Sequence, residues 1–169
     1  AQSVPYFRLL GGQSYSKIGQ KQTITFSPNY WKTNIANNDL ISSLLIGLSA
    51  GARVSLSTCL ETEVGVGYYQ LQSMTPSGKV YQYSTPDFYN MNYHYAILHR
   101  SLMLEGKLLT RYASIYHPYI SVAIGISRNH SYAYQETPFQ DYAVPDPAFT
   151  SATQTSMSYA VGFGLDIDI

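Results

Sequence analysis

Large apolar side chains fall on every second position in the last part of the chain. In residues 157–169, Met, Tyr, Val, Phe, Leu and Ile occupy the odd positions, whereas Ser, Ala, Gly and Asp occupy the even ones. A period of two residues indicates a β-strand, because successive side chains point to opposite faces. The same alternation recurs upstream. We therefore predict six strands, at residues 5–12, 45–56, 60–69, 100–109, 119–127 and 156–169.

The segments between these strands alternate in length. Two connections are short, at residues 55–59 and 110–118, and three are long, at roughly 14–42, 73–92 and 129–155. The runs QTITF and KVYQY within the long connections are candidates to extend hairpins beyond the main sheet. An antiparallel meander with short turns at one end and long loops at the other is typical of outer-membrane β-barrels.

The two faces of the predicted strands differ in an unusual way. One face is apolar throughout, and the other carries mostly Gly, Ala and Ser. Charged residues make up 12% of the chain, against about a quarter in ordinary soluble domains. A soluble sandwich would expose a more charged second face. We therefore expect the large residues to face lipid and the small ones to line a narrow lumen.

Most strand charges lie on the small-residue face, toward the end with the short turns. We expect them to form one layer near the periplasmic end of the lumen and to pair, since isolated charges in such an interior are costly. A structural plug of ion pairs is favoured over a proton or ion pathway. The predicted layer comprises Arg8, Arg53, Glu61, Glu63, Glu105, Lys107, Asp166 and Asp168.

Composition narrows the function classes. The formal net charge of zero gives no basic footprint for nucleic acid. Cys59 is the single cysteine, so an internal disulfide is impossible. The opening AQSVPYF has neither the charged nor the apolar part of a signal peptide. Because the initial Met is missing, we expect a mature start after cleavage; a cytosolic start that lacks its Met and a trimmed start are the alternatives.

Tyrosine is abundant, with 17 residues, and its amphipathic ring suits membrane interfaces. We expect two aromatic belts, with packing inside extended hairpins as the alternative. The candidates are Tyr112, Tyr116 and Tyr119 on the short-turn side, and Tyr15, Tyr68, Tyr69, Tyr93, Tyr95, Tyr132 and Tyr134 on the long-loop side.

By this hairpin pattern, the chain resembles the small outer-membrane barrels of the OmpA, OmpX and opacity-protein type. The resemblance covers most of the chain and rests on pattern, without a diagnostic motif. It implies an up-and-down transmembrane barrel of about eight antiparallel strands, with periplasmic termini and long surface loops. It also implies anchoring, adhesion or surface interaction in a Gram-negative outer membrane rather than enzymatic activity. We expect residues 1–169 to form one such domain.

The strand count departs from that resemblance. Six strands are predicted, and the chain ends on Ile169, whereas such barrels typically close on a strand that ends in Phe or Trp. Either a final hairpin of about 30 residues is absent, or two strands lie within the long connections. We favour the absent hairpin.

Catalysis has one candidate motif. His99 and Ser101 share a strand face, as in the His-x-Ser pair of lipid A deacylases, which the motif resembles. Glu105 lies about 13 Å from Ser101 along the strand, too far to orient His99. His94, His117 and His130 lack metal-like spacing. We therefore expect no catalytic residues, no metal and no cofactor.

The long loops are the best functional candidates, because they expose aromatic and amide side chains with few charges. Such surfaces suit contact with proteins or glycans, although variable surface loops would look alike. Besides outer-membrane lipids and lipopolysaccharide, we expect host or cell-surface partners. A small pore is the alternative function, and a lipid A acyl-ester hydrolase is a distant third. The loop candidates are Tyr30, Trp31, Phe88, Tyr89, Phe139, Tyr142 and Phe149.

Overall fold

The computed structural model describes residues 3–19, 21–83, 88–110, 115–147 and 150–167, and these residues form an all-β structure. None of them belongs to a helix long and apolar enough to cross a membrane. Six strands are long: β1 (Ser3–Ser16), β4 (Ile41–Ser57), β5 (Leu60–Met74), β7 (Tyr89–Thr110), β8 (Tyr116–Pro138) and β9 (Ser151–Ile167). Three are short: β2 (Lys21–Ser27), β3 (Tyr30–Ala36) and β6 (Ser77–Gln82).

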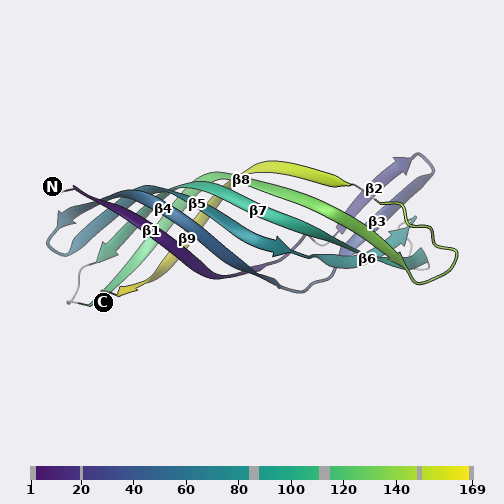
Figure 1. Cartoon of the computed structure of the whole chain (residues 1–169), viewed down its shortest axis with the longest axis horizontal. Coiled ribbons are helices and arrows are strands. Elements are labelled where there is room, and N and C mark those ends of the chain that lie inside the picture. The colour runs from purple at the N-terminus through teal and green to yellow at the C-terminus, as the bar shows by residue number, and fades with distance from the viewer. Residues whose placement is uncertain (1–2, 20, 84–87, 111–114, 148–149, 168–169) are drawn as a thin grey trace.

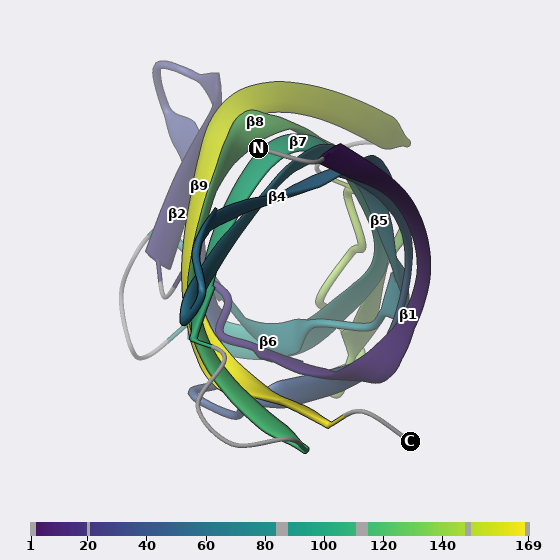
Figure 2. The same cartoon turned by 90° about the vertical axis from the view of Figure 1, so that its left-hand side faces the viewer.

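The long strands confirm the predicted antiparallel meander. They pair in the order β1-β4-β5-β7-β8-β9, and every neighbouring pair is antiparallel. The sheet curves around a common axis (Figure 2). It is not closed, since no ladder joins β1 to β9 among the described residues. The start of β1 and the end of β9 lie at one end of the molecule, which we call the proximal end (Figure 1).

The short strands form a branch at the opposite, distal end. β2 pairs with β3, β3 with β6, and β6 with the first part of β7. The runs QTITF and KVYQY are therefore strand segments, as expected. The sequence predicts a loop where the structure has β3, and that prediction is wrong. The long connections do contain additional strands. These strands extend the distal end of the sheet (Figure 1) and do not lie between β9 and β1.

The long strands reach further than the pattern predicted, chiefly at their distal ends. The connection expected at 129–155 is shorter, because β8 continues to Pro138 and β9 starts at Ser151. β5 and β7 also extend into the connection predicted at 73–92. The missed parts are rich in Tyr, Asn, Gln and Ser, where the alternation of large apolar with small residues breaks down.

The alternation along the strands separates an exposed face from an inner one. Apolar side chains cover the outer face, and Phe163 reaches 90% exposure. On the inner face, Glu63, Ser49 and Ser127 are buried. We call the outer surface the apolar band; its most exposed members are Phe7, Leu9, Ile120, Val122, Met157, Tyr159, Val161 and Phe163.

Two glycines show why the strands need small residues. A Cβ atom on Gly125 would lie 2.0 Å from the backbone oxygen of Leu102, and one on Gly51 would lie 2.2 Å from that of Val64. Both contacts are with the neighbouring strand's backbone, which cannot move aside cheaply. A Cβ atom on Gly106, by contrast, would make only an ordinary van der Waals contact, 3.8 Å from Val122 Cγ2.

The distal branch has its own apolar core. Val80, Met91, Tyr93, Tyr134 and Ala143 pack together there. We call this unit the head; it comprises β2, β3, β6, the first part of β7, the last part of β8 and the connection that follows β8. Tyr93 and Tyr134 are thus buried in hairpin packing, and this supports the alternative to an aromatic belt at those two positions. Tyr112 lies outside the described residues.

Candidate functional site

Glu63 is the centre of an ion-pair network on the inner face near the proximal end. Its Oε2 lies 2.7 Å from Arg8 Nη2 and 4.0 Å from Lys107 Nζ, and its Oε1 lies 2.5 Å from Arg53 Nη2. The side chain of Glu63 is 1% exposed. A buried carboxylate is tolerable only when cations and hydrogen bonds replace its water, and three cations surround this one.

Strand register explains part of this network. Arg53 and Lys107 lie directly opposite Glu63 on the two neighbouring strands, β4 and β7. Arg8 belongs to β1, which pairs with β4, so its long side chain must reach across one strand. Lys107 also reaches across β8 to Asp166 on β9, with Nζ 2.5 Å from Oδ2.

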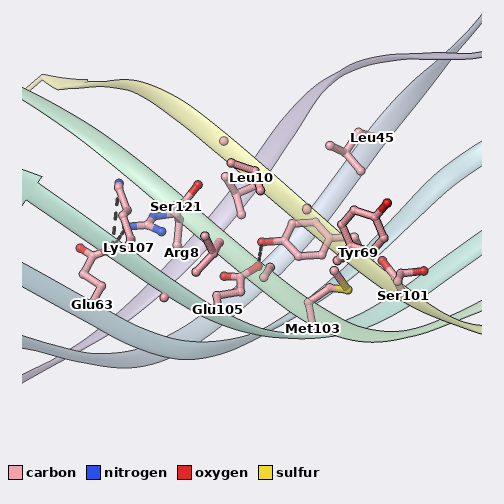
Figure 3. A pocket seen from close by; sticks show the side chains of 18 of the residues that line it. Arg8, Leu10, Leu45, Glu63, Tyr69, Ser101, Met103, Glu105, Lys107 and Ser121 are labelled. Carbon is pink, nitrogen blue, oxygen red and sulfur yellow. Dashed lines mark hydrogen bonds and ion pairs between the residues drawn. The ribbon is translucent and has the colours of Figure 1, made fainter.

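The result is a chain of ion pairs across the interior, from Arg8 on β1 through Glu63 and Lys107 to Asp166 on β9. Its ends lie on β1 and β9, the outermost strands of the six-strand path, which no ladder joins among the described residues. The ion pairs therefore brace the inner face of the curved sheet from β1 to β9, and the first and last links each pass over one intervening strand, β4 or β8. Figure 3 shows Arg8, Glu63 and Lys107 gathered at one end of the interior.

Glu105 does not join this network. Its Oε1 accepts a hydrogen bond from the hydroxyl of Tyr69, on the neighbouring strand β5 (Figure 3). Glu61 lies at the edge of the network, 3.8 Å from Arg53 Nη1, and also accepts a hydrogen bond from Ser55. Asp168, the last member of the predicted layer, lies outside the described residues. The structure thus brings six of the eight predicted residues together: Arg8, Arg53, Glu61, Glu63, Lys107 and Asp166.

A cavity of about 530 Å³ extends from this network toward the distal end. Arg8, Glu63 and Lys107 line one end, and Ser101 and His99 also line the cavity. In Figure 3 the charged group and Ser101 lie at opposite ends of the view. Charged side chains therefore fill the interior near the proximal end, and the cavity lies on their distal side.

The candidate nucleophile Ser101 lies in this interior. It is buried, and Ser127 lies opposite it on β8. His99 Nδ1 lies 2.6 Å from Asn129 Oδ1, so an amide orients this imidazole. Glu105, the carboxylate considered from the sequence, is engaged by Tyr69. Among the described residues, no group of three or more His, Cys, Asp and Glu side chains is arranged to hold a metal ion.

Within the head, a second, fully buried ion pair joins β3 to the end of β8. Lys32 Nζ lies 2.9 Å from Glu136 Oε2, and both side chains are 0% exposed. Lys32 also donates to the backbone oxygen of Asp146 at 3.0 Å, and the backbone nitrogen of Asp146 donates to Glu136 at 2.9 Å. Nearby, Asn34 Nδ2 donates to the hydroxyl of Tyr134. These contacts fasten β3 to β8 and to the connection that follows it.

An aromatic network covers the far end of the head. Tyr83 contacts Tyr30, Trp31 and Phe88 edge-on, with ring centroids 5.7–5.8 Å apart. The backbone of Tyr83 has a φ of 54°, a left-handed conformation that costs a non-glycine residue about 1–2 kcal/mol. Its three ring contacts offset that cost. Two groups of contacting rings make up what we call the aromatic surface: one consists of Phe26, Tyr30, Trp31, Tyr83 and Phe88, and the other of Tyr81, Tyr89 and Phe139.

Five of the seven predicted loop candidates belong to the aromatic surface. The prediction that Tyr30, Trp31 and Tyr89 lie in loops is wrong, because Tyr30 and Trp31 are on β3 and Tyr89 begins β7. The aromatic and β-branched residues of YWKTNIA were a strand signal that the preceding SPN turn sequence obscured. Tyr142 is exposed after β8, and Phe149 lies outside the described residues.

The sequence did not indicate the three other members of the aromatic surface, Phe26, Tyr81 and Tyr83. Searches against protein-family models, curated proteins and solved structures found no match to this chain.

Proposed function

We propose that this chain forms a bacterial outer-membrane β-barrel, plugged proximally by its ion-pair network, and that its head makes contacts outside the cell. The role is structural and interactive rather than catalytic. Its surroundings are outer-membrane lipids and lipopolysaccharide, and its partners are proteins or glycans of other cell surfaces. The proposal extends the resemblance to small OmpA-type barrels noted from the sequence.

The apolar band carries this proposal. Tyr159, Val161 and Phe163 are 81–90% exposed on β9, while the opposite face of the sheet buries charges. A water-soluble sheet would place these two kinds of residue the other way round. A lipid environment makes both placements favourable, since the apolar side chains meet hydrocarbon and the charges pair within the interior.

Insertion requires that the edges of β1 and β9 be paired, because lipid cannot satisfy their backbone groups. Neighbouring strands are antiparallel throughout the six-strand path, so β1 and β9 run in opposite directions. An antiparallel closure therefore takes either direct pairing of β1 with β9 or an even number of additional strands between them. The proposal thus includes a closed form of the sheet.

The aromatic surface supports the interactive part of the proposal. Its rings belong to a head with its own core and a buried ion pair, so they are held in place before any partner arrives. Pre-ordered aromatic side chains contribute strongly to interfaces, because little entropy is lost when they are covered.

Trp31, the single tryptophan, allows a direct test of membrane placement. The protein is reconstituted into vesicles whose acyl chains carry bromine, which quenches tryptophan fluorescence on contact. In a Trp31→Phe background, Phe163→Trp places the fluorophore in the apolar band. We expect strong quenching of that variant and little quenching of the native Trp31 in the head. Equal quenching at both positions, or protein that remains soluble without detergent, would overturn the proposal.

The cavity favours a small pore as a second candidate. Recordings of ionic current across a planar bilayer distinguish the plugged barrel from the pore. The plugged barrel should give no steady conductance, whereas a pore should conduct, and Glu63→Gln should then alter its ion selectivity because Glu63 lines the cavity.

A further inference from the structure

A second hollow lies in the distal half of the molecule, apart from both the ion-pair network and the aromatic surface. It has a volume of about 280 Å³. It lies among the β2–β3 hairpin, β7, β8 and the start of β9, which supply Gln22, Tyr95, Ser131 and Gln154 respectively. This volume lies just below the range of about 300–1,000 Å³ that is typical of ligand pockets.

Three tyrosines form one side of the pocket. Tyr93 stacks on Tyr95 and on Tyr134, with ring centroids 6.1 and 5.8 Å apart and planes within 19° of parallel. The hydroxyl of Tyr134 is fixed between Asn34 and Glu136. Because Tyr93 and Tyr134 also belong to the core of the head, this aromatic wall is rigid.

Amides and hydroxyls supply the remaining side-chain polarity. Asn129, Gln22, Gln154 and Ser131 line the pocket, and the hydrogen bond to His99 holds Asn129 in place. No residue that lines this pocket in the described part of the chain carries a formal charge. A strongly charged ligand would therefore lack a counter-charge there, and a purely apolar one would strip water from several amides without replacing it.

One polar group of the lining lacks a partner. Asn34 is 5% exposed. Its Nδ2 donates to the hydroxyl of Tyr134, whereas its Oδ1 has no hydrogen-bond partner in the part of the chain that the structure describes. A buried carbonyl oxygen of this kind requires a donor from water or from a ligand. A ligand with hydroxyl groups would provide one.

We propose that this pocket binds one neutral sugar unit. A hexose has the right size, presents C–H faces that pack on tyrosine rings, and carries hydroxyls that both donate to and accept from amides. The sugar is either free or the terminal unit of a surface glycan. This inference goes beyond the proposed function, because it needs the folded head and not membrane insertion.

Binding is tested with the full chain in a detergent without a sugar head group, such as an amine oxide, because maltosides and glucosides would compete for the pocket. Saturation-transfer NMR is run with glucose, galactose, mannose and N-acetylglucosamine, and an array of immobilised glycans supplies the second arm. A free-sugar ligand gives signals in the first arm alone; a glycan terminus gives binding in the second. N-acetylneuraminic acid and adenosine serve as charged and aromatic comparators. No binding to any neutral sugar in either arm, or binding to a comparator alone, would overturn the inference.

Variants locate the site. Gln22→Ala and Gln154→Ala remove exposed amides of the lining and should each weaken binding about fivefold. Gln135→Ala is the matched control, since Gln135 is exposed on β8 but does not line the pocket. Tyr95→Phe keeps the ring and should retain binding within about threefold, whereas Tyr95→Ala should lose at least about tenfold. If Gln135→Ala weakens binding as much as the pocket variants do, the sugar binds elsewhere and the inference fails.

Discussion

The buried pair of Lys32 and Glu136 provides the sharpest test of how the head is held together. Both side chains are fully buried. Lys32 Nζ contacts Glu136 at 2.9 Å and the Asp146 backbone oxygen at 3.0 Å. Glu136 also accepts hydrogen bonds from the hydroxyl of Tyr134 and from the backbone nitrogen of Asp146. Removal of either charge therefore leaves the other buried among neutral groups.

Such an uncompensated charge costs about 3–5 kcal/mol. Lys32→Met preserves most of the side-chain volume, and Glu136→Gln preserves an oxygen that accepts from Tyr134 or Asp146. Each single variant should lose about 3 kcal/mol of local stability. The double variant removes both charges together and should lose only about 1–2 kcal/mol, because replacing a whole buried pair is far less costly than breaking it. The resulting coupling energy is about 4–5 kcal/mol.

Hydrogen exchange followed by mass spectrometry measures the loss of local stability in each variant. Exchange of peptides from β3 and the end of β8 should be about 150-fold faster in each single variant, which corresponds to about 3 kcal/mol. Peptides from β4 and β5 serve as internal controls. Lys79→Met is the matched variant: Lys79 is exposed, lies over the Tyr89 ring and should cost under about 1 kcal/mol. If the double variant loses the sum of the two single losses, the charges do not stabilise one another and the reasoning is refuted.

Three further outcomes follow from the structure. Glu63→Gln should lower the unfolding free energy by about 3 kcal/mol, because three cations lose their shared carboxylate. Glu61→Gln should cost less, about 1–2 kcal/mol, because it loses a cation at 3.8 Å and keeps an oxygen that accepts from Ser55. The midpoint temperature of heat-modifiable gel migration compares the two variants, and equal losses would contradict the central place of Glu63. Gly125→Ala should destabilise by at least about 2 kcal/mol through its backbone clash, while Gly106→Ala should be neutral or slightly stabilising; the same gel assay would count against the packing argument if the two variants behaved alike. In the head, burial raises the pKa of Tyr93 from its ordinary value of 10.0 to about 12, with Tyr95 as a smaller cause. Folding therefore favours its neutral form, and this contribution to stability is complete below pH 10 and is lost as the pH rises toward 12. Tyrosinate absorbance should show a late-titrating group that disappears in Tyr93→Phe; an unchanged titration curve would contradict the assignment.

The sequence by itself determined the long strands and the assignment of their faces. A strand side chain must point to one face or the other, so the alternation in residues 157–165 already separates Phe163 from Gly162 without knowledge of any partner. For the same reason Arg8, Glu63 and Lys107 could be assigned to one face. Register then brings Glu63 and Lys107 together, because they lie opposite each other on paired strands.

Only the tertiary structure decided the contacts between strands that are not neighbours. Arg8 and Glu63 are 55 residues apart, and Lys32 and Glu136 are 104 apart. No local sequence pattern encodes these contacts between distant side chains, because the contacts depend on how strongly the sheet curves. The structure also decided that β3 is a strand, because this segment of mixed polarity is fixed by its pairing with β6. It likewise decided the partner of Glu105, which accepts a hydrogen bond from Tyr69 instead of joining the ion-pair network. Local side-chain alternation sets which way a residue faces, whereas curvature and side-chain reach determine what it meets.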